Sequence, residues 1–365
     1  MKLIIAGGGT GGHLFPGIAV AEEFLSRNPA NEVLFVGTER GIEARAVPAA
    51  GYNLELISAA GIRGKGSLSK IKGIAMMIYG YAQSRKILKK FKPDMVLGVG
   101  GYASLPMVLA ARGMQIPRFI HEQNAIPGQT NRLLARFASK VFITLEESIR
   151  YFPSATTMLT GNPLRRQILD MVENISQSSA KDDVRDGNNF QLFIFGGSQG
   201  AHAINTAMVE ALPLLKKVRA NLVITHQTGE KDCAEVTAAY RAAGVEGKIT
   251  PFISDMAAEY AKADLIVCRA GATTIAEVTA CGKACMFIPF PHAVDDHQRR
   301  NAEALLKKDA CFMMLERELD GGSLAQAILT LAEDPNLVRR TGKLAFGLAR
   351  LDAAQIIVDE MVNTH

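Results

Sequence analysis

The feature that most constrains this sequence is a glycine-rich turn that follows an apolar run in each half of the chain. The first turn, GGGTGGH (7–13), follows the apolar run 3–6 and precedes a helical pattern from Pro16 to about Ser26. The second, GGSQG (196–200), follows the run 191–195 and precedes a helical pattern over 202–216. A buried strand that passes through glycines into a helix opens many parallel α/β domains. Two such openings predict two Rossmann-like domains in tandem.

The rest of each half alternates strand-like and helical patterns. Further strand-like runs lie at 33–36, 54–57, 95–99, 118–121, 140–144, 222–226, 248–252, 265–268 and 284–288, with helical patterns such as 68–90 and 104–112 between them. This alternation predicts an α/β fold whose doubly wound parallel sheets are covered on both faces. The polar stretch 174–189 between the halves predicts a surface loop or linker.

The size and composition exclude several classes of protein. A chain of 365 residues predicts two or three domains. No apolar stretch approaches the roughly 18–20 residues that span a bilayer, and the first apolar run is too short for a signal peptide. The five cysteines are odd in number and absent from the first 232 residues, which predicts reduced thiols in a cytoplasmic protein. No zinc-ligand spacing accompanies them.

Positive charge is concentrated in the first half. Residues 1–165 hold 20 Lys and Arg against 10 Asp and Glu, whereas residues 166–365 hold 21 against 26. Between Gly61 and Lys92 there are nine basic residues and no acidic residue. Such a cluster indicates either a polyanionic partner or a solvated helix face. No nucleic-acid-binding motif accompanies it, so we expect no nucleic-acid partner.

The first turn contains a G-x-G-x-x-G match at Gly7, Gly9 and Gly12. Glycines at this place let a phosphate approach the N-terminus of a helix, where unpaired N–H groups favour anions. The match also allows a dinucleotide site, which requires an acidic residue at the end of the second strand, and Glu39 comes slightly late for that. No Walker motif is present.

Two later turns carry polar residues that suit a nucleotide ligand. Gly271 and the residues after it begin a helix that would present backbone N–H groups, and Glu277 lies one turn further in. That carboxylate is suited either to accept hydroxyl groups of a ribose or to interact with the helix dipole. The proline-rich loop 287–298 leaves another strand, and its Asp295-Asp296 pair resembles half of a metal-binding acidic pair.

These segments together resemble the MurG family of N-acetylglucosaminyltransferases. The matching segments are GGGTGGHLFPGIAVA (7–21), GIRGKG (61–66), KPDMVLGVGGYAS (92–104), HEQNAIPGQTN (121–131), TGNPLR (160–165), FGGSQGAHAIN (195–205), FISDMAAEYAKADLIVCRAGATTIAE (252–277) and PFPHAVDDHQRRNA (289–302). They occur in the family's order and cover nearly the whole chain. One departure is Ala270, which stands where many relatives have Ser, so no hydroxyl contact is expected there.

The resemblance implies a GT-B fold, with two Rossmann-like domains separated by a cleft. It places the acceptor- and membrane-binding domain at 1–163, with a C-terminal helix at about 350–365 packing back on it, and the UDP-GlcNAc domain at 164–349. The implied reaction transfers GlcNAc from UDP-GlcNAc, with inversion, to the C4 hydroxyl of MurNAc in undecaprenyl-diphospho-MurNAc-pentapeptide (lipid I). The product is lipid II, so the implied partners include cell-wall synthesis or cell-division proteins.

The resemblance also implies a site, residue by residue. The residues expected at the donor UDP-GlcNAc are Thr10, Gly11, Gly12, Asn124, Arg165, Ser198, Gln199, Ile253, Ala272, Thr273, Thr274, Glu277 and Gln298. Ile253 would contact uracil through its backbone, Glu277 would hold the ribose, and Gln298 would meet the GlcNAc hydroxyls. Gly9, His13 and Tyr102 are expected at the acceptor. No metal and no cofactor are expected, because Arg165 and helix N-termini can balance the charge of departing UDP.

An inverting displacement requires a base for the acceptor proton. His13 suits this role because the unperturbed pKa of histidine lies near 6.5, and it suits equally a role in orienting the loop. Glu122, in the His121-Glu122 pair, is a second candidate for the catalytic base.

The segment 68–90 is expected to bind an anionic membrane surface, on the cytoplasmic side of the cell membrane and without spanning it. Ile74, Ile78 and Tyr81 fall at helical spacing on one apolar face flanked by basic residues. Such a stripe is otherwise typical of core packing.

Two alternative functions remain open at this point. One is a related GT-B enzyme, a UDP-GlcNAc 2-epimerase, which needs no lipid acceptor. The other is a non-catalytic nucleotide-sugar-binding protein. The basic-apolar segment argues against the first, and the two sets of glycine turns argue against the second.

Overall fold

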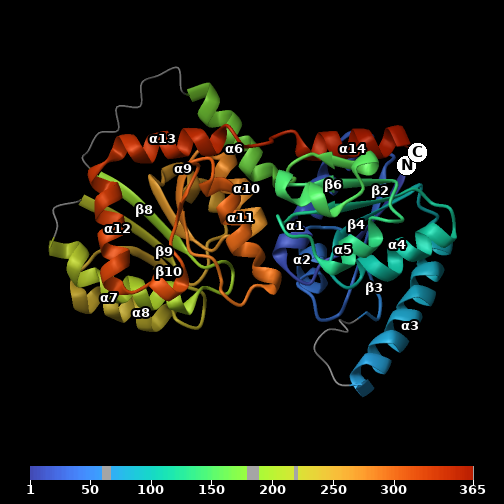
Figure 1. Cartoon of the computed structure of the whole chain (residues 1–365), viewed down its shortest axis with the longest axis horizontal. Helices are drawn as coiled ribbons and strands as arrows, with labels where there is room; N and C mark the ends of the chain where they lie inside the picture. The colour runs from blue at the N-terminus through green and yellow to red at the C-terminus, as the bar shows by residue number, and fades with distance from the viewer. Residues whose placement is uncertain (60–66, 179–188, 218–220, 365) are drawn as a thin grey trace. The chain divides into compact units, whose positions relative to one another are not determined.

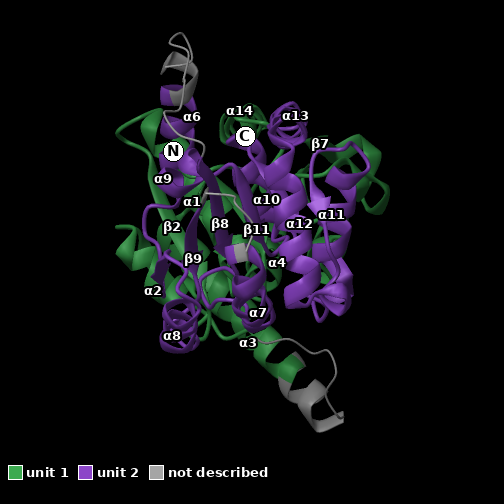
Figure 2. Ribbon diagram, turned by 90° about the vertical axis from the view of Figure 1, so that its left-hand side faces the viewer, with its two compact units in different colours: residues 1–166, 350–365 green, residues 167–349 purple. Residues whose placement is uncertain are grey.

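The computed structural model describes residues 1–59, 67–178, 189–217 and 221–364. The chain forms two compact units, which Figure 2 distinguishes by colour. Unit 1 comprises Met1–Arg166 and Arg350–His365, and unit 2 comprises Gln167–Ala349. The chain thus passes between the units near residues 166 and 350, whereas the sequence places the first boundary after residue 163.

Unit 1 is built on a seven-stranded parallel sheet in the order β3-β2-β1-β4-β5-β6-β7. Its strands are β1 (Lys2–Gly7), β2 (Glu32–Gly37), β3 (Asn53–Leu56), β4 (Met95–Gly100), β5 (Arg118–Glu122), β6 (Lys140–Ile143) and β7 (Thr157–Leu159). Its helices are α1 (Gly11–Ser26), α2 (Glu43–Ala49), α3 (Ser67–Phe91), α4 (Ser104–Gly113), α5 (Gln129–Leu134), α14 (Ala353–Thr364) and the 3-10 turns η1 (Glu146–Tyr151) and η2 (Ser154–Thr156).

Alternation along the strands of unit 1 produces two cores, one on each face of the sheet. In β1, Leu3 and Ile5 point to the face covered by α1, whereas Ile4 and Ala6 point to the face covered by α3 and α4. Strands buried on both faces read as continuous apolar runs, which is why these strands could be found in the sequence.

The C-terminal helix α14 belongs to unit 1 (Figures 1 and 2). It packs against α1, and its buried residues Ile357, Val358 and Met361 join the same core as Leu14 and Phe24. Two ion pairs fix its outer side, Arg27 with Asp359 and Lys140 with Glu360. The amphipathic pattern of this segment therefore reflects packing against α1.

Unit 2 repeats the construction with a six-stranded parallel sheet in the order β10-β9-β8-β11-β12-β13. Its strands are β8 (Asn189–Phe195), β9 (Asn221–Gln227), β10 (Lys248–Thr250), β11 (Leu265–Cys268), β12 (Ala284–Phe287) and β13 (Phe312–Met313). Its helices are α6 (Arg166–Ser178), α7 (His202–Lys217), α8 (Cys233–Ala243), α9 (Met256–Lys262), α10 (Ala272–Ala280), α11 (His297–Leu306), α12 (Gly321–Glu333), α13 (Pro335–Phe346) and the 3-10 turns η3 (Val294–Asp296) and η4 (Glu316–Glu318). Helices α7 and α12 cover one face of the sheet, and α10 and α11 lie on the other (Figure 1).

The α/β architecture with two parallel sheets is confirmed, and some local predictions are wrong. The short edge strands β7 and β13 were not predicted, because two or three residues carry too little pattern. The predicted linker begins too early, since α6 continues to Ser178, and residues 179–188 lie outside the described part of the chain. All five cysteines are free thiols, as expected for a protein without a disulfide framework.

Candidate active site

Each sheet has a topological switch point, where neighbouring strands lead into helices on opposite faces. In unit 1 this point lies between β1 and β4, because α1 and α4 pack in different cores. In unit 2 it lies between β8 and β11. Ligands of such sheets bind at the carboxyl ends of the strands beside the switch point. Both predicted glycine turns lie there.

In unit 1 the turns after β1 and β4 pack backbone against backbone. Gly8 N–H donates to Gly100 O at 3.2 Å. A Cβ on Gly7 would lie 2.2 Å from Gly100 O, and one on Gly101 would lie 2.4 Å from Gly8 O. Only residues without a side chain fit this contact, and these glycines also have positive φ angles. Buried Ser104 reinforces the junction, since its Oγ accepts from Gly100 N–H at 3.0 Å.

His13 lies in the first turn of α1 with its ring against Gly100. A Cβ on Gly100 would come within 2.3 Å of His13 Cδ2, so the ring occupies the space that a side chain would need. His13 Nδ1 lies 3.0 Å from Thr10 Oγ1, the hydroxyl of the residue that precedes α1. Tyr102, on the turn after β4, is 57% exposed. The structure thus brings Thr10, His13 and Tyr102 to one edge of the sheet.

A buried carboxylate that the sequence analysis missed lies behind the first turn. Glu43 is 1% exposed, and its oxygens accept hydrogen bonds from Gly9 N–H at 2.6 Å and from Thr38 N–H at 2.9 Å. A dinucleotide site needs an exposed acidic residue near the end of β2 to bind the ribose hydroxyls. The carboxylate that this chain has in that region, Glu43, is buried. Its bonds to the backbone argue against a dinucleotide site. No local pattern marks Glu43, because Gly9 is 34 residues away.

The His121-Glu122 pair at the end of β5 is fully buried and bonded. His121 Nε2 donates to Gly161 O at 3.2 Å, while Nδ1 accepts from the Gln123 side chain at 3.0 Å. Burial lowers the pKa of His121 to about 4, so the ring is neutral. Glu122 accepts from Asn124 N–H at 3.0 Å and from Asn124 Nδ2 at 3.2 Å.

The second oxygen of Glu122 holds the rest of its loop. It accepts from Gly128 N–H at 3.1 Å and from Asn131 Nδ2 at 2.9 Å, and burial raises the pKa of the carboxyl. The geometry places Glu122 as the anchor of the loop that presents Asn124.

Arg165 lies one residue before the end of the first segment of unit 1, and its guanidinium lies over an aromatic ring beside the glycine turn. Its guanidinium carbon is 5.3 Å from the centroid of the Phe15 ring. Phe15 also covers Gly11, where a Cβ would lie 2.9 Å from the ring. The cation is therefore placed next to the start of α1.

In unit 2 the backbone of the turn after β8 packs closely against the backbone of the loop after β9. A Cβ on Gly200 would lie 1.9 Å from Thr228 O, and one on Gly229 would lie 2.3 Å from Gln199 O. Ser198 and Gln199, both predicted to meet the donor, are exposed at the tip of this turn.

Gln227, which the sequence analysis missed, ties this turn to the loop that holds Ile253. Its Nε2 donates to Gly197 O at 3.0 Å, and its Oε1 accepts from Ile253 N–H at 2.8 Å. The N–H group of Ile253 is therefore already hydrogen-bonded within the protein.

Residues 269–271 connect β11 to helix α10, and Gly271 is the N-cap of the helix in an extended conformation. Ala272, Thr273 and Thr274 form its first turn at the switch point. Glu277 follows one turn later and is 3% exposed, and Tyr260 OH donates to its Oε2 at 3.1 Å. The carboxylate is thus positioned by a tyrosine from α9.

Gln298 lies at the start of α11, and its Oε1 accepts from Phe290 N–H at 3.0 Å. It therefore fixes the proline-rich loop that the sequence analysis identified. Asp295 and Asp296 of that loop have positive φ angles of 53° and 54°. In the described part of the chain, no three His, Cys, Asp or Glu side chains gather in a way that could hold a metal ion.

Comparison with known proteins assigns the family. The sequence profile of the glycosyltransferase family 28 N-terminal domain matches residues 3–143, and that of the glycosyltransferase family 28 C-terminal domain matches residues 191–355. The chain belongs to glycosyltransferase family 28. Both switch points lie inside the matched segments.

Curated relatives of this family 28 chain are similar over its full length. It is 69% identical to the UDP-N-acetylglucosamine–N-acetylmuramyl-(pentapeptide) pyrophosphoryl-undecaprenol N-acetylglucosamine transferase of Pelobacter propionicus, over 99% of both chains. It is 66% identical to the enzyme of the same name from Geobacter sulfurreducens, over 99% of this chain and 98% of that one.

Solved structures extend the comparison. The crystal structure of Acinetobacter baumannii MurG is 32% identical, covers 99% of each chain and has a TM-score of 0.79. The resemblance to the MurG family and the GT-B fold class are confirmed. A UDP-GlcNAc 2-epimerase from Neisseria meningitidis, 15% identical over 100% of both chains with a TM-score of 0.68, shares the fold.

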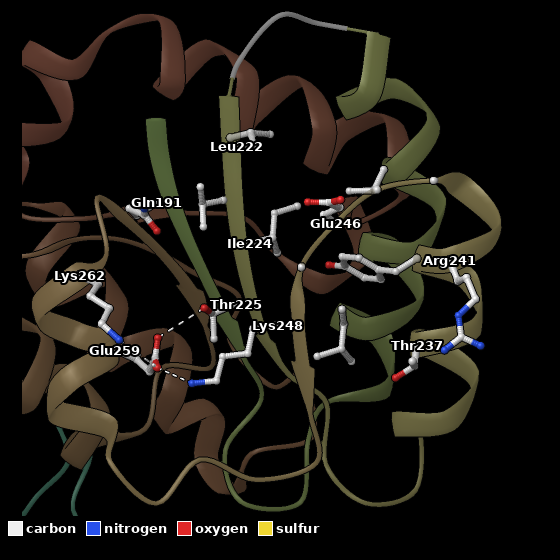
Figure 3. Close-up of a pocket in the computed structure, with 16 residues that line it drawn as sticks. Gln191, Leu222, Ile224, Thr225, Thr237, Arg241, Glu246, Lys248, Glu259 and Lys262 are labelled. Atoms are coloured by element: carbon white, nitrogen blue, oxygen red, sulfur yellow. Dashed lines mark hydrogen bonds and ion pairs between the residues drawn. The ribbon is translucent and has the colours of Figure 1, made fainter. Parts of the chain in front are cut away.

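The family 28 chain also has a hollow away from the switch points (Figure 3). It has a volume of about 990 Å³ and lies along the edge of the unit 2 sheet, lined by residues of β9, β10, α8 and α9. Glu259 pairs there with Lys248 at 2.6 Å. No predicted site residue lines it, so it is separate from the predicted donor site.

The segment predicted to meet the membrane forms α3, and one residue of the prediction is wrong. Ile78 is 66% exposed, as expected, but Tyr81 packs against the unit 1 core, and its hydroxyl lies close to Gly113. The exposed aromatic residue is Tyr79, at 59%. Ile74 is in the helix, but its side chain lies outside the described part of the structure. Among the described residues, none of the helices has the length and hydropathy needed to cross a bilayer.

Proposed function

We propose that this chain transfers GlcNAc from UDP-GlcNAc to the C4 hydroxyl of MurNAc in lipid I, with inversion, to give lipid II. The observation that carries the proposal is the 69% identity, over nearly the whole chain, to a transferase of that name. The presence of a glycine turn at the switch point of each sheet supports it, because a glycosyl transfer between two substrates needs two sites.

Unit 2 is assigned to the donor. The N-terminus of α10, with Ala272, Thr273 and Thr274, would meet the diphosphate together with Ser198, since helix N-termini favour anions. The buried carboxylate of Glu277, held by Tyr260, would accept ribose hydroxyl groups. Gln199 and Gln298 would bind the GlcNAc hydroxyls, and Ile253 would meet uracil.

Unit 1 is assigned to the acceptor. Gly9, His13 and Tyr102 would face the acceptor. The resemblance to the MurG family also implies donor contacts for Thr10, Gly11, Gly12, Asn124 and Arg165. In this assignment, Glu122 positions Asn124 through its two bonds to that residue.

His13 is assigned as the base. If Nδ1–H donates to Thr10 Oγ1, the lone pair on Nε2 can accept the proton of the acceptor C4 hydroxyl. The C4 oxygen then bonds to C1 of GlcNAc from the face opposite UDP, and the bond from C1 to the diphosphate oxygen breaks. The start of α10 and Arg165 would stabilise the charge that develops on UDP. The proposed reaction assigns no step to a cofactor or a protein-bound metal, and activity in excess chelator tests this.

Membrane attachment is assigned to α3, as peripheral binding at the surface where lipid I resides. Ile78 and Tyr79 are exposed side by side, and the exposed residues Arg85, Lys86 and Lys89 follow on the same helix. Each basic residue near an anionic surface contributes about 1 kcal/mol, a term that salt screens.

Co-sedimentation with anionic vesicles tests this assignment. Wild type should bind at low salt and be released at high salt, and the double variant Ile78→Ser, Tyr79→Ser should bind weakly at both. The matched control is Val294→Ser, which removes an apolar residue of similar exposure from unit 2. Equal sedimentation of the double variant and wild type would place the docking surface elsewhere.

Release of UDP tests the catalytic proposal. The purified protein should release UDP from UDP-GlcNAc only when a lipid-linked MurNAc acceptor is added, and the product should carry a new β-linked GlcNAc. Formation of UDP-ManNAc without acceptor would indicate an epimerase instead. Binding of UDP-GlcNAc without either reaction would indicate a binding protein.

A further inference from the structure

We propose that Glu43 is a positioning residue whose buried carboxylate holds the first glycine turn in the shape that receives the acceptor diphosphate. The inference rests on the proposed function for the identity of the ligand. It concerns a residue outside the predicted site, on a helix that carries none of the predicted contacts.

Glu43 joins two segments that are distant in the sequence. It is the first residue of α2, and its Oε2 accepts from Gly9 N–H at 2.6 Å, a short bond of the charge-assisted kind. Its Oε1 accepts from Thr38 N–H at 2.9 Å and from Thr38 Oγ1 at 3.0 Å. The carboxylate therefore ties the turn after β1 to the end of β2.

Three glycines leave space for this one side chain. A Cβ on Gly8, Gly37 or Gly41 would lie 2.4, 2.3 or 1.9 Å from side-chain atoms of Glu43. These contacts are too short for any real Cβ, so each of the three positions has to lack a side chain while Glu43 stays in place. The backbone of two segments, the turn after β1 and the stretch from the end of β2 to α2, is thus closed around a single carboxylate that is 1% exposed.

The held turn is open on its other side. Gly9 has a φ of 87°, and a Cβ built on it would meet nothing within 4 Å. Its N–H points to Glu43 while the next residues begin α1, whose N-terminus would receive the diphosphate. A turn fixed before the ligand arrives needs no reorganisation when it binds.

Because Glu43 is negatively charged, its two possible effects on acceptor binding, repulsion of the diphosphate and positioning of the turn, can be distinguished. A carboxylate behind the turn repels a diphosphate, so its removal should tighten acceptor binding if charge alone mattered. If the carboxylate positions the turn, its removal should weaken binding, because Gly9 N–H loses its acceptor. The two explanations predict acceptor KM changes of opposite sign.

The variant that tests this is Glu43→Gln. A carboxamide has one acceptor oxygen, so its NH2 group must face either Gly9 N–H or the Thr38 pair. We expect acceptor kcat/KM to fall about tenfold or more, mainly through KM, while donor KM changes less than about threefold. Glu43→Asp, which keeps the charge on a shorter stem, should recover part of the loss. The matched control is Glu39→Gln, which removes the same charge from an exposed residue nearby and should leave both constants unchanged.

A second readout does not depend on activity. Amide hydrogen exchange in a peptide covering residues 8–13 should be faster in Glu43→Gln than in wild type or Glu39→Gln. Lower acceptor KM in Glu43→Gln, or a lower Tm with unchanged acceptor KM and unchanged exchange, would overturn the proposal. If wild type transfers no sugar, the proposed function fails, and the exchange comparison still decides whether Glu43 holds the turn.

Discussion

In unit 1 a carboxylate holds the turn after β1, whereas in unit 2 an amide holds the turn after β8. Glu43 can only accept, so it bonds to N–H groups, of Gly9 and Thr38. Gln227 both donates and accepts, so it bonds to Gly197 O in its turn and to Ile253 N–H in the next loop.

This difference determines which backbone groups of each turn remain available to a ligand. In unit 1, Glu43 accepts a hydrogen bond from an N–H group of the turn, so the N–H groups that remain for an anion are those at the start of α1. The unit 2 anchor uses a carbonyl, so it takes no N–H group from the turn that carries Ser198. We infer that the same glycine-rich pattern is fixed from behind by opposite hydrogen-bonding chemistry.

The largest effect is expected where the unit 2 turn meets its neighbour. Gly200 and Gly197 both have positive φ angles, but only a Cβ on Gly200 would clash, at 1.9 Å from Thr228 O. Gly200→Ala should lower the free energy of unfolding by about 3 kcal/mol or more, and Gly197→Ala by about 1 kcal/mol. Denaturant unfolding measures both. Equal losses would show that backbone strain, and not the contact, fixes the turn.

The next effect concerns the donor alone. Glu277→Ala should weaken UDP-GlcNAc binding about ten- to hundredfold, because a charge-assisted hydrogen bond to the ribose is lost. Acceptor KM should hardly change. Tyr260→Phe is the matched control, since it keeps the carboxylate and removes only the hydroxyl that positions it, and its effect should be smaller. Unchanged donor KM and unchanged UDP inhibition in Glu277→Ala would contradict the assignment.

A substitution at Gln227 tests whether the amide is needed to hold the unit 2 turn. Gln227→Glu replaces the amide donor with an oxygen that faces Gly197 O, so the turn should shift. We expect donor KM to rise about tenfold with little change in acceptor KM, the reverse of Glu43→Gln. Steady-state kinetics with each substrate varied in turn measures this. A rise confined to acceptor KM would show that the unit 2 turn does not serve the donor.

The smallest effect tests a feature that the units share. His121 in unit 1 and His226 in unit 2 are both buried, and burial lowers the pKa of each to about 4, so both are neutral. An unfolded histidine titrates near 6.5, so between these values the unfolded chain binds more protons and stability falls as pH falls. From about pH 6.5 to about pH 5.5 we expect a loss of about 1 kcal/mol for each histidine.

Denaturant unfolding at the two pH values checks this expectation. His226→Gln, which can replace both ring contacts, should lose less stability over the same interval than wild type. An identical loss in the variant and in wild type would show that His226 is not the titrating group.

Much of the fold could be predicted because buried parallel strands appear in the sequence as continuous apolar runs. Strand β11 was predicted with its observed bounds, 265–268, and the glycine turns were found because their spacing is local. The edge strand β13 was missed because its pattern covers two residues. On α3, apolar residues occur on more than one face, so periodicity alone chose Tyr81 where the exposed residue is Tyr79.

The candidate site was predictable only where a motif carries it. Thr10, His13 and Ser198 lie on turns that the sequence displays, and the structure places each at a switch point. Glu43 and Gln227 act on residues about 30 positions away, through contacts that exist only once the strands are ordered in the sheet. No local pattern distinguishes such anchors from ordinary surface residues.

The central claim is that the Gly9 end of the unit 1 turn serves the acceptor and that Glu277 of unit 2 serves the donor. Its most direct test is one comparison of two variants. Acceptor KM and UDP-GlcNAc affinity should be measured for Glu43→Gln and Glu277→Ala under the same conditions. We predict that Glu43→Gln changes mainly the acceptor constant and Glu277→Ala mainly the donor constant. If both variants change the same constant by similar factors, Glu43 and Glu277 do not act on different substrates and the account is wrong.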